Sequence, residues 1–103
     1  FSLANLEYAN LSQTTAVRAT FHSANLRHAK FESATLSSSN FREANLYRAN
    51  FSNANLSHAD LTRVDASFSN FSGADLTCSK CYQSKFSESQ FRQSNLAQAD
   101  CLR

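Results

Sequence analysis

The sequence repeats itself every five residues along its length. In the stretch 44–61, ANLYRANFSNANLSHADL, each repeat has a small residue, then Asn or Asp, then a large apolar residue. On an α-helix a step of five residues turns by about 140°, which spreads the large residues around the axis. On a flat β-strand the same step places them alternately on the two faces. Neither element would have one apolar side, so the repeat requires another kind of fold.

Two positions of each repeat suit an apolar interior. The position of the large residue, called the centre, recurs from Phe1 to Cys101 and never holds a polar residue. Two residues before each centre the side chain is small, and Val64 is the exception. A backbone that points both positions inward and then turns forms a four-sided coil of twenty residues. Stacked coils would pair their backbones about 4.8 Å apart. The expected core consists of these central residues: Phe21, Leu26, Phe31, Leu36, Phe41, Leu46, Phe51, Leu56, Phe71 and Leu76.

The residue just before each centre is expected to make the corner. It is Asn or Asp in most repeats, as at Asn5, Asn45 and Asp60. The usual turn residues are scarce, because the chain has one glycine and no proline. Asn and Asp side chains bond to nearby backbone groups, which allows a chain without glycine to turn.

The phrase A-(N/D)-(L/F)-(S/T/R)-x resembles the pentapeptide-repeat family over the whole chain. The resemblance implies an all-β fold, a right-handed quadrilateral β-helix (solenoid) of about five 20-residue coils. Residues 1–103 would then form a single domain. The pattern shows no cap at either end, so we expect an excerpt of a longer chain or a domain without its caps. Uncapped ends would expose backbone and core, which permits end-to-end self-association.

The C-terminal repeats depart from the pattern. Serine fills successive small positions from Ser79 to Ser94, and Cys81 and Cys101 are central residues. These departures predict a looser C-terminal end. The two cysteines stack one coil apart, at a separation that permits a disulfide. Cysteine is also a good small core residue, so we favour free thiols over a bond, although the sequence leaves the pairing open. Unpaired cysteines are compatible with a reducing compartment such as the cytoplasm, but the sequence does not specify the compartment.

The two residues after each centre point outward and define four faces, numbered one to four from Phe1, Leu6, Leu11 and Ala16. Faces one and two carry most of the charged residues, whereas faces three and four carry mostly Ser, Gln and Asn. Exposed aromatic and arginine residues are typical of protein contact sites. The candidate interaction surface comprises Tyr8, Arg27, His28, Tyr47, Arg48 and Phe68 on face two, and Arg42, Arg63 and Tyr82 on face one. Alternatively, these side chains only form ladders that stabilise neighbouring coils.

Enzymatic chemistry is not expected. Cys78 and Cys81 spell CSKC, but the first points outward and the second inward. His58 and Cys78 should lie side by side on face four, yet no third ligand or orienting carboxylate accompanies them. A convex rod filled with Leu, Phe and Ala should have no pocket for catalysis. We therefore expect no catalytic residue, metal, cofactor or small-molecule substrate.

These features favour a structural or scaffold module that presents a rigid surface to another protein, whose identity the sequence does not specify. The family resemblance implies an alternative, because some members protect DNA gyrase from quinolones by imitating the shape and negative charge of DNA. The net charge of +2 disfavours that role here. Ten basic residues are offset by eight acidic ones, so nucleic-acid binding is disfavoured as well. No apolar run approaches the roughly 20 residues of a membrane span.

Overall fold

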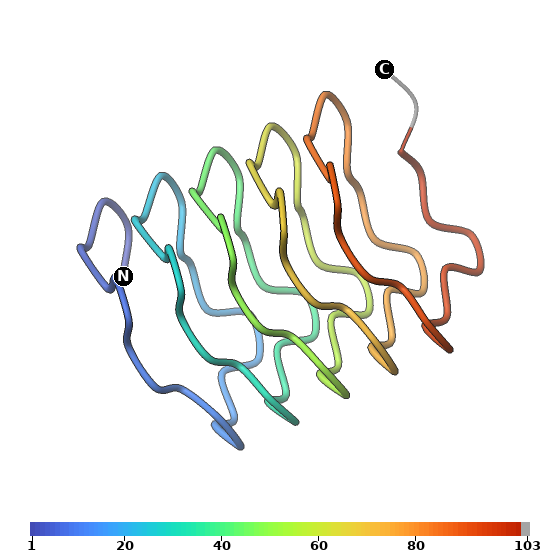
Figure 1. The fold of residues 1–103 in the computed structure, drawn as a ribbon, viewed down its shortest axis with the longest axis horizontal. Coiled ribbons are helices and arrows are strands. Elements are labelled where there is room, and N and C mark those ends of the chain that lie inside the picture. The colour runs from blue at the N-terminus through green and yellow to red at the C-terminus, as the bar shows by residue number, and fades with distance from the viewer. Residues whose placement is uncertain (102–103) are drawn as a thin grey trace.

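The computed structural model describes residues 1–101 as a stack of four-sided coils that share one axis (Figure 1). Within these residues there is no helix and no continuous strand. Instead, single parallel β-bridges recur every five residues and join residues twenty apart, from Asn5 with Asn25 to Lys80 with Asp100. The coil of twenty residues is therefore as expected. The body is squat rather than rod-like, with extents of 30 × 26 × 25 Å.

Neighbouring coils are joined by backbone hydrogen bonds that repeat in every pentad. In residues 26–30, the N–H of Leu26 donates to the carbonyl of Asn45 at 2.8 Å. The N–H of His28 donates to the carbonyl of Tyr47 at 2.9 Å. Both acceptors lie nineteen residues further along the chain, so each coil is bonded edge to edge to the next. This ladder fixes the register that places residues twenty apart in one column.

Each corner is a tight turn with a left-handed residue. The N–H of Ala29, for example, donates to the carbonyl of Leu26 at 3.0 Å. The second outward residue of each pentad, such as His28, has a φ of 57–64°, and Gly73 has a φ of 70°. This conformation costs a non-glycine residue about 1 kcal/mol, and the inter-coil ladder compensates for it. The sequence analysis missed this feature, although no β-branched residue occupies the position in any pentad.

Asn and Asp side chains support these turns as expected. Oδ1 of Asn25 accepts a hydrogen bond from the N–H of Arg27 at 3.2 Å. Oδ1 of Asn45 accepts one from the N–H of Tyr47 at 3.1 Å. In both cases the acceptor and the donor are two residues apart, which is the local bond typical of Asn and Asp in turns.

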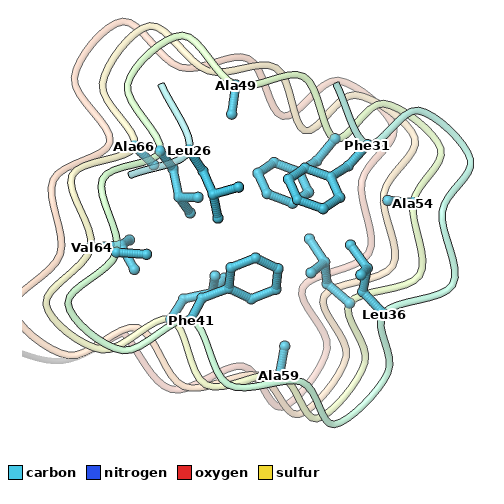
Figure 2. Close-up of a cluster of buried hydrophobic side chains, with 14 of the residues drawn as sticks. Leu26, Phe31, Leu36, Phe41, Ala49, Ala54, Ala59, Val64 and Ala66 are labelled. Atoms are coloured by element: carbon cyan, nitrogen blue, oxygen red, sulfur yellow. The ribbon is translucent and has the colours of Figure 1, made fainter. Parts of the chain in front are cut away.

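The centres and small residues meet in one apolar core (Figure 2). All ten central residues named above are 0–2% exposed. The Phe31 and Phe51 rings stack with their centroids 4.8 Å apart and almost parallel. The Phe41 ring meets Phe51 edge-on at 5.7 Å. Facing columns of phenylalanine thus interlock through alternating parallel and perpendicular contacts, which aromatic rings prefer.

One pentad exchanges the sizes of its two inward residues. Val64 is 2% exposed and Ala66 is fully buried, and Figure 2 shows both at the same side of the core. Leu26 and Leu46 occupy the centres equivalent to Ala66 in the preceding coils. We infer that Val64 fills part of the volume that a leucine at position 66 would occupy.

This exchange predicts strong coupling between the two positions. Ala66→Leu alone should overpack the core, and Val64→Ala alone should leave a cavity, each destabilising the fold by about 1–2 kcal/mol. The double variant should recover most of that loss because it restores the regular pattern. Urea unfolding of the three variants measures the coupling. Additive losses in the double variant would show that the two side chains do not share the space.

Three of the small-position serines in the C-terminal repeats pair their hydroxyls with the backbone, whereas Oγ of Ser79 is buried without a hydrogen-bond partner. Oγ of Ser94 donates to the carbonyl of Phe91 at 2.7 Å, and Oγ of Ser89 donates to the carbonyl of Ala66 at 2.7 Å. Oγ of Ser84 accepts from the N–H of Val64 at 3.2 Å. The backbone therefore accommodates these hydroxyls, and the parallel bridges continue through Lys80 and Asp100. The serines in this structure do not interrupt the C-terminal coil.

The expectation of free thiols at Cys81 and Cys101 was wrong. The two residues form a disulfide, with Cα atoms 4.4 Å apart and a sequence separation of 20. Residues in one column are separated by a single coil spacing, which lies within the range of disulfide geometry. Cys78 is the free cysteine. The disulfide joins Cys81, at the start of the last complete coil, to Cys101, the first residue after that coil.

Candidate interaction surface

The second outward residues of face two form a column across successive coils. The left-handed turn places these side chains outside, and the register aligns residues twenty apart. Tyr8 and His28 stack with ring centroids 4.6 Å apart and an interplanar angle of 11°. Arg48 and Phe68 continue the column, with the Arg48 guanidinium carbon 5.4 Å from the Phe68 ring centroid.

Tyr47 links this column to the adjacent column of first outward residues, which includes Arg27. Its ring lies edge-on to His28 at 6.3 Å and to Phe68 at 5.6 Å. The guanidinium carbons of Arg27 and Arg48 lie 4.8 Å and 5.5 Å from the Tyr47 ring centroid. We call the resulting continuous patch the face-two cluster. It comprises Tyr8, Arg27, His28, Tyr47, Arg48 and Phe68.

The cluster combines solvent exposure with apolar area. Tyr8 is 67% exposed and Phe68 is 48% exposed. Arg27 lies 3.5 Å from a carboxylate oxygen of Glu7, so its charge is balanced. Arg48 is exposed and makes no ion pair with any residue that the structure describes. The surface is therefore aromatic and locally cationic.

The three face-one candidates lie outside the face-two cluster and have partners of their own. Arg42 lies 3.4 Å from Asp60. Arg63 lies 3.5 Å from Glu43. These distances describe solvent-exposed pairs, which contribute little to stability. The sequence grouped these residues with face two by charge, whereas the contacts separate them.

Two of these partnerships shift pKa values. Partial burial acts against ionisation of Asp60, but hydrogen bonds from the Thr62 backbone and from Arg42 hold its pKa below the ordinary value. Tyr82 donates a hydrogen bond to Asp100 at 2.6 Å. This bond to a carboxylate raises the pKa of Tyr82. Both shifts follow from local pairing on the surface and do not mark a buried catalytic group.

The sequence predicted no pocket for catalysis, and the described chain is hollowed at the C-terminal end of the stack. One hollow is lined by Gln83, Ser84, Lys85 and Ser87 together with Cys81, Phe86 and Cys101. A second, apolar hollow of about 120 Å³ opens between the last coils. It lies in the last coil, where Leu96 is 44% exposed. Its lining offers no acid, base or hydroxyl nucleophile. The lining residues are Leu61, Leu76, Cys81, Phe86, Phe91, Leu96 and Cys101.

The face-four pair shows no arrangement for chemistry. Sγ of Cys78 lies 3.1 Å from Oε1 of Gln98, on the side away from the coil that carries His58. Among residues 1–101 no group of three His, Cys, Asp or Glu side chains is placed to hold a metal ion. The same part of the chain contains no helix long and apolar enough to cross a membrane.

The chain belongs to the pentapeptide-repeat family. Residues 1–37 and 39–77 match the family described as pentapeptide repeats (8 copies). The match covers most of the chain and confirms the resemblance seen in the repeated phrase. No curated protein matches the sequence.

Solved structures of pentapeptide repeat proteins share the fold. HetL from Nostoc sp. PCC 7120, described as involved in heterocyst differentiation regulation, is 27% identical, with a TM-score of 0.74 over 93% of this chain and 50% of its own. The protein alr5209 of the same strain is 25% identical, with a TM-score of 0.83 over 100% of this chain and 84% of its own. A thylakoid-lumen protein of Arabidopsis thaliana is 30% identical, with a TM-score of 0.51 over 94% of this chain and 64% of its own. The chain thus spans half of the HetL chain and less than two thirds of the Arabidopsis chain.

Proposed function

We propose that this chain is a non-enzymatic interaction module, in which a right-handed quadrilateral β-helix presents the face-two cluster to another protein. The observation that carries the proposal is the continuous contact of three aromatic side chains, one histidine and two arginines across four successive coils. Tyrosine and arginine are enriched among residues that dominate binding energy in protein interfaces. Faces three and four offer no comparable patch.

Rigidity supports the same role. The backbone of every coil is hydrogen-bonded to its neighbour, and the cluster side chains are held by one another. A preformed surface loses little conformational entropy on binding, so more of the contact energy contributes to affinity. The stacked rings also stabilise the coils, but that role does not require Phe68 or Tyr8 to be so exposed.

The DNA-imitating role gains no support from the surface. A DNA-like surface needs a row of unpaired negative charges. Glu7, Glu43 and Asp60 each lie within 4 Å of a basic side chain. HetL is described as involved in the regulation of heterocyst differentiation, and a regulatory role accords with a binding module.

Affinity capture from the source cells tests the proposal. The bait is compared with a variant carrying Tyr8→Ser, Arg48→Ser and Phe68→Ser. Loss of such side chains typically removes more than about 2 kcal/mol from a protein interface, so a specific partner should be captured at least about tenfold less.

The matched control carries Gln13→Ser, Arg18→Ser and Gln93→Ser, which occupy the same turn position on faces three and four. Thermal melts of all three proteins should first show that the folds are intact. Equal captures by the parent and the face-two variant would overturn the proposal. A partner lost from both variants would place the contact elsewhere on the body.

A further inference from the structure

Arg48 is the one cluster member whose charge has no counterpart. Its guanidinium carbon lies 5.5 Å from the Tyr47 ring centroid and 5.4 Å from that of Phe68. Within residues 1–101 no carboxylate lies within 4 Å of it. By contrast, Arg27, Arg42 and Arg63 each have an acidic partner. The two rings hold the Arg48 side chain in place without neutralising it.

The surroundings of Arg48 are cationic. Lys30, at the corner beside face two, is exposed and likewise has no acidic partner in the described chain. The acidic outward residues of face two stand near its ends, at Glu7 and Glu88. Glu7 is paired with Arg27, and the nearby corner residue Asp65 accepts a hydrogen bond from the Ser67 backbone. Arg48 and Lys30 outnumber the carboxylate of Asp65, which has no cationic partner among residues 1–101, so the middle of the face carries a net positive charge.

We propose that the middle of the face-two cluster binds a carboxylate side chain in an acidic segment of the partner protein, and that Arg48 is the residue that binds it. This inference rests on the proposed function and names the chemistry of the partner. A guanidinium packed against aromatic rings leaves its N–H edge free for bidentate contact with a carboxylate. When a partner covers the cluster, the rings would help to exclude water from the contact, which strengthens a charged hydrogen bond. Apolar residues beside the carboxylate would contact Tyr8 and Phe68.

A nucleic acid fits the same surface less well. Sequence-tolerant binding of single strands requires exposed ring faces and a row of cations along the phosphates. The face of Tyr8 is stacked on His28, and the remaining aromatic contacts are edge-on. On and beside this face the cations without an ion pair among the described residues are Arg48 and the corner residues Lys30 and Lys85, which is too few to follow a phosphate chain.

The probe is a fluorescein-labelled random copolymer of glutamate and tyrosine, titrated with the intact protein at low salt and followed by fluorescence anisotropy. Arg48→Gln should weaken its binding by about tenfold, the effect of losing one charge-assisted contact. Arg48→Lys should bind the copolymer with an affinity between those of the parent and of Arg48→Gln, because lysine keeps the positive charge but lacks the planar guanidinium. Arg18→Gln is the matched control, since Arg18 is exposed at the equivalent turn position of face four and should change binding less than about twofold.

Absence of copolymer binding, or equal weakening by Arg48→Gln and Arg18→Gln, would overturn the inference. Tighter binding of a fluorescein-labelled oligothymidylate than of the copolymer would also overturn it and indicate nucleic acid. The outcomes distinguish a failure of the carboxylate proposal from a failure of the proposed function. A partner lost from the face-two variant without any copolymer binding would overturn only the carboxylate chemistry. Copolymer binding that depends on Arg48, together with unchanged capture from cells, would support the carboxylate site and overturn the proposed function.

Discussion

Phe51→Asp is expected to unfold the protein. Phe51 is fully buried, and its ring stacks on Phe31 at 4.8 Å and on Phe71 at 5.1 Å. Removing a buried phenylalanine side chain costs about 3–5 kcal/mol. Placing a carboxylate without a partner in its position adds several kcal/mol or forces its protonation. Together these losses approach the whole stability of a small domain, about 5–15 kcal/mol. Leu46→Asp should have the same outcome, because Leu46 is equally buried.

The measurement is far-ultraviolet circular dichroism with a thermal melt, supported by size-exclusion chromatography. Ser52→Asp is the matched control, since Ser52 follows Phe51 directly and points outward. A surface substitution of this kind changes stability by less than about 0.5 kcal/mol. If Phe51→Asp melted like Ser52→Asp, the assignment of residues to inward columns would be wrong.

Reduction of the Cys81–Cys101 disulfide is expected to destabilise the C-terminal coil by about 3 kcal/mol. The bond closes a loop of twenty residues, and a link of that length removes conformational entropy from the unfolded chain and so raises the free energy of that state by about this much. In a stacked repeat each coil contacts only its neighbours, so the loss should be local. Hydrogen exchange should accelerate mainly in residues 82–101, while the coils around Phe31 and Phe51 keep their protection.

Two variants make this prediction specific. Cys81→Ser with Cys101→Ser should reproduce the effect of the reducing agent, and the reducing agent should then change nothing further. Cys78→Ser should behave like the parent, because Cys78 is free. If the intact mass did not rise by two hydrogens on reduction, the two thiols would be unpaired and the expectation from the sequence would stand.

The candidate surface was only partly predictable. Residues twenty apart must share a column once the coil length is known, so Tyr8, His28 and Phe68 could be grouped from the sequence. The partners of Arg42 and Arg63 could not be read in this way. Long side chains reach across a corner or an adjacent coil, and their contacts depend on side-chain conformation rather than on register. The structure therefore separates face one from the face-two cluster.

The coil of twenty residues, the inward residues and the Asn and Asp corners can all be predicted from the order of residues alone. These follow from local covalent geometry and from the removal of apolar side chains from water, which a five-residue period satisfies in few ways. The three-dimensional arrangement was needed to establish the left-handed turn residues, the Cys81–Cys101 disulfide and the apolar hollow at the C-terminal end. The structure also shows that the Arg48 guanidinium packs against the Tyr47 and Phe68 rings and has no carboxylate partner among the described residues. The turn conformation is set by the hydrogen-bonded ladder between coils, and the contacts of side chains depend on their conformations, neither of which the order of residues specifies.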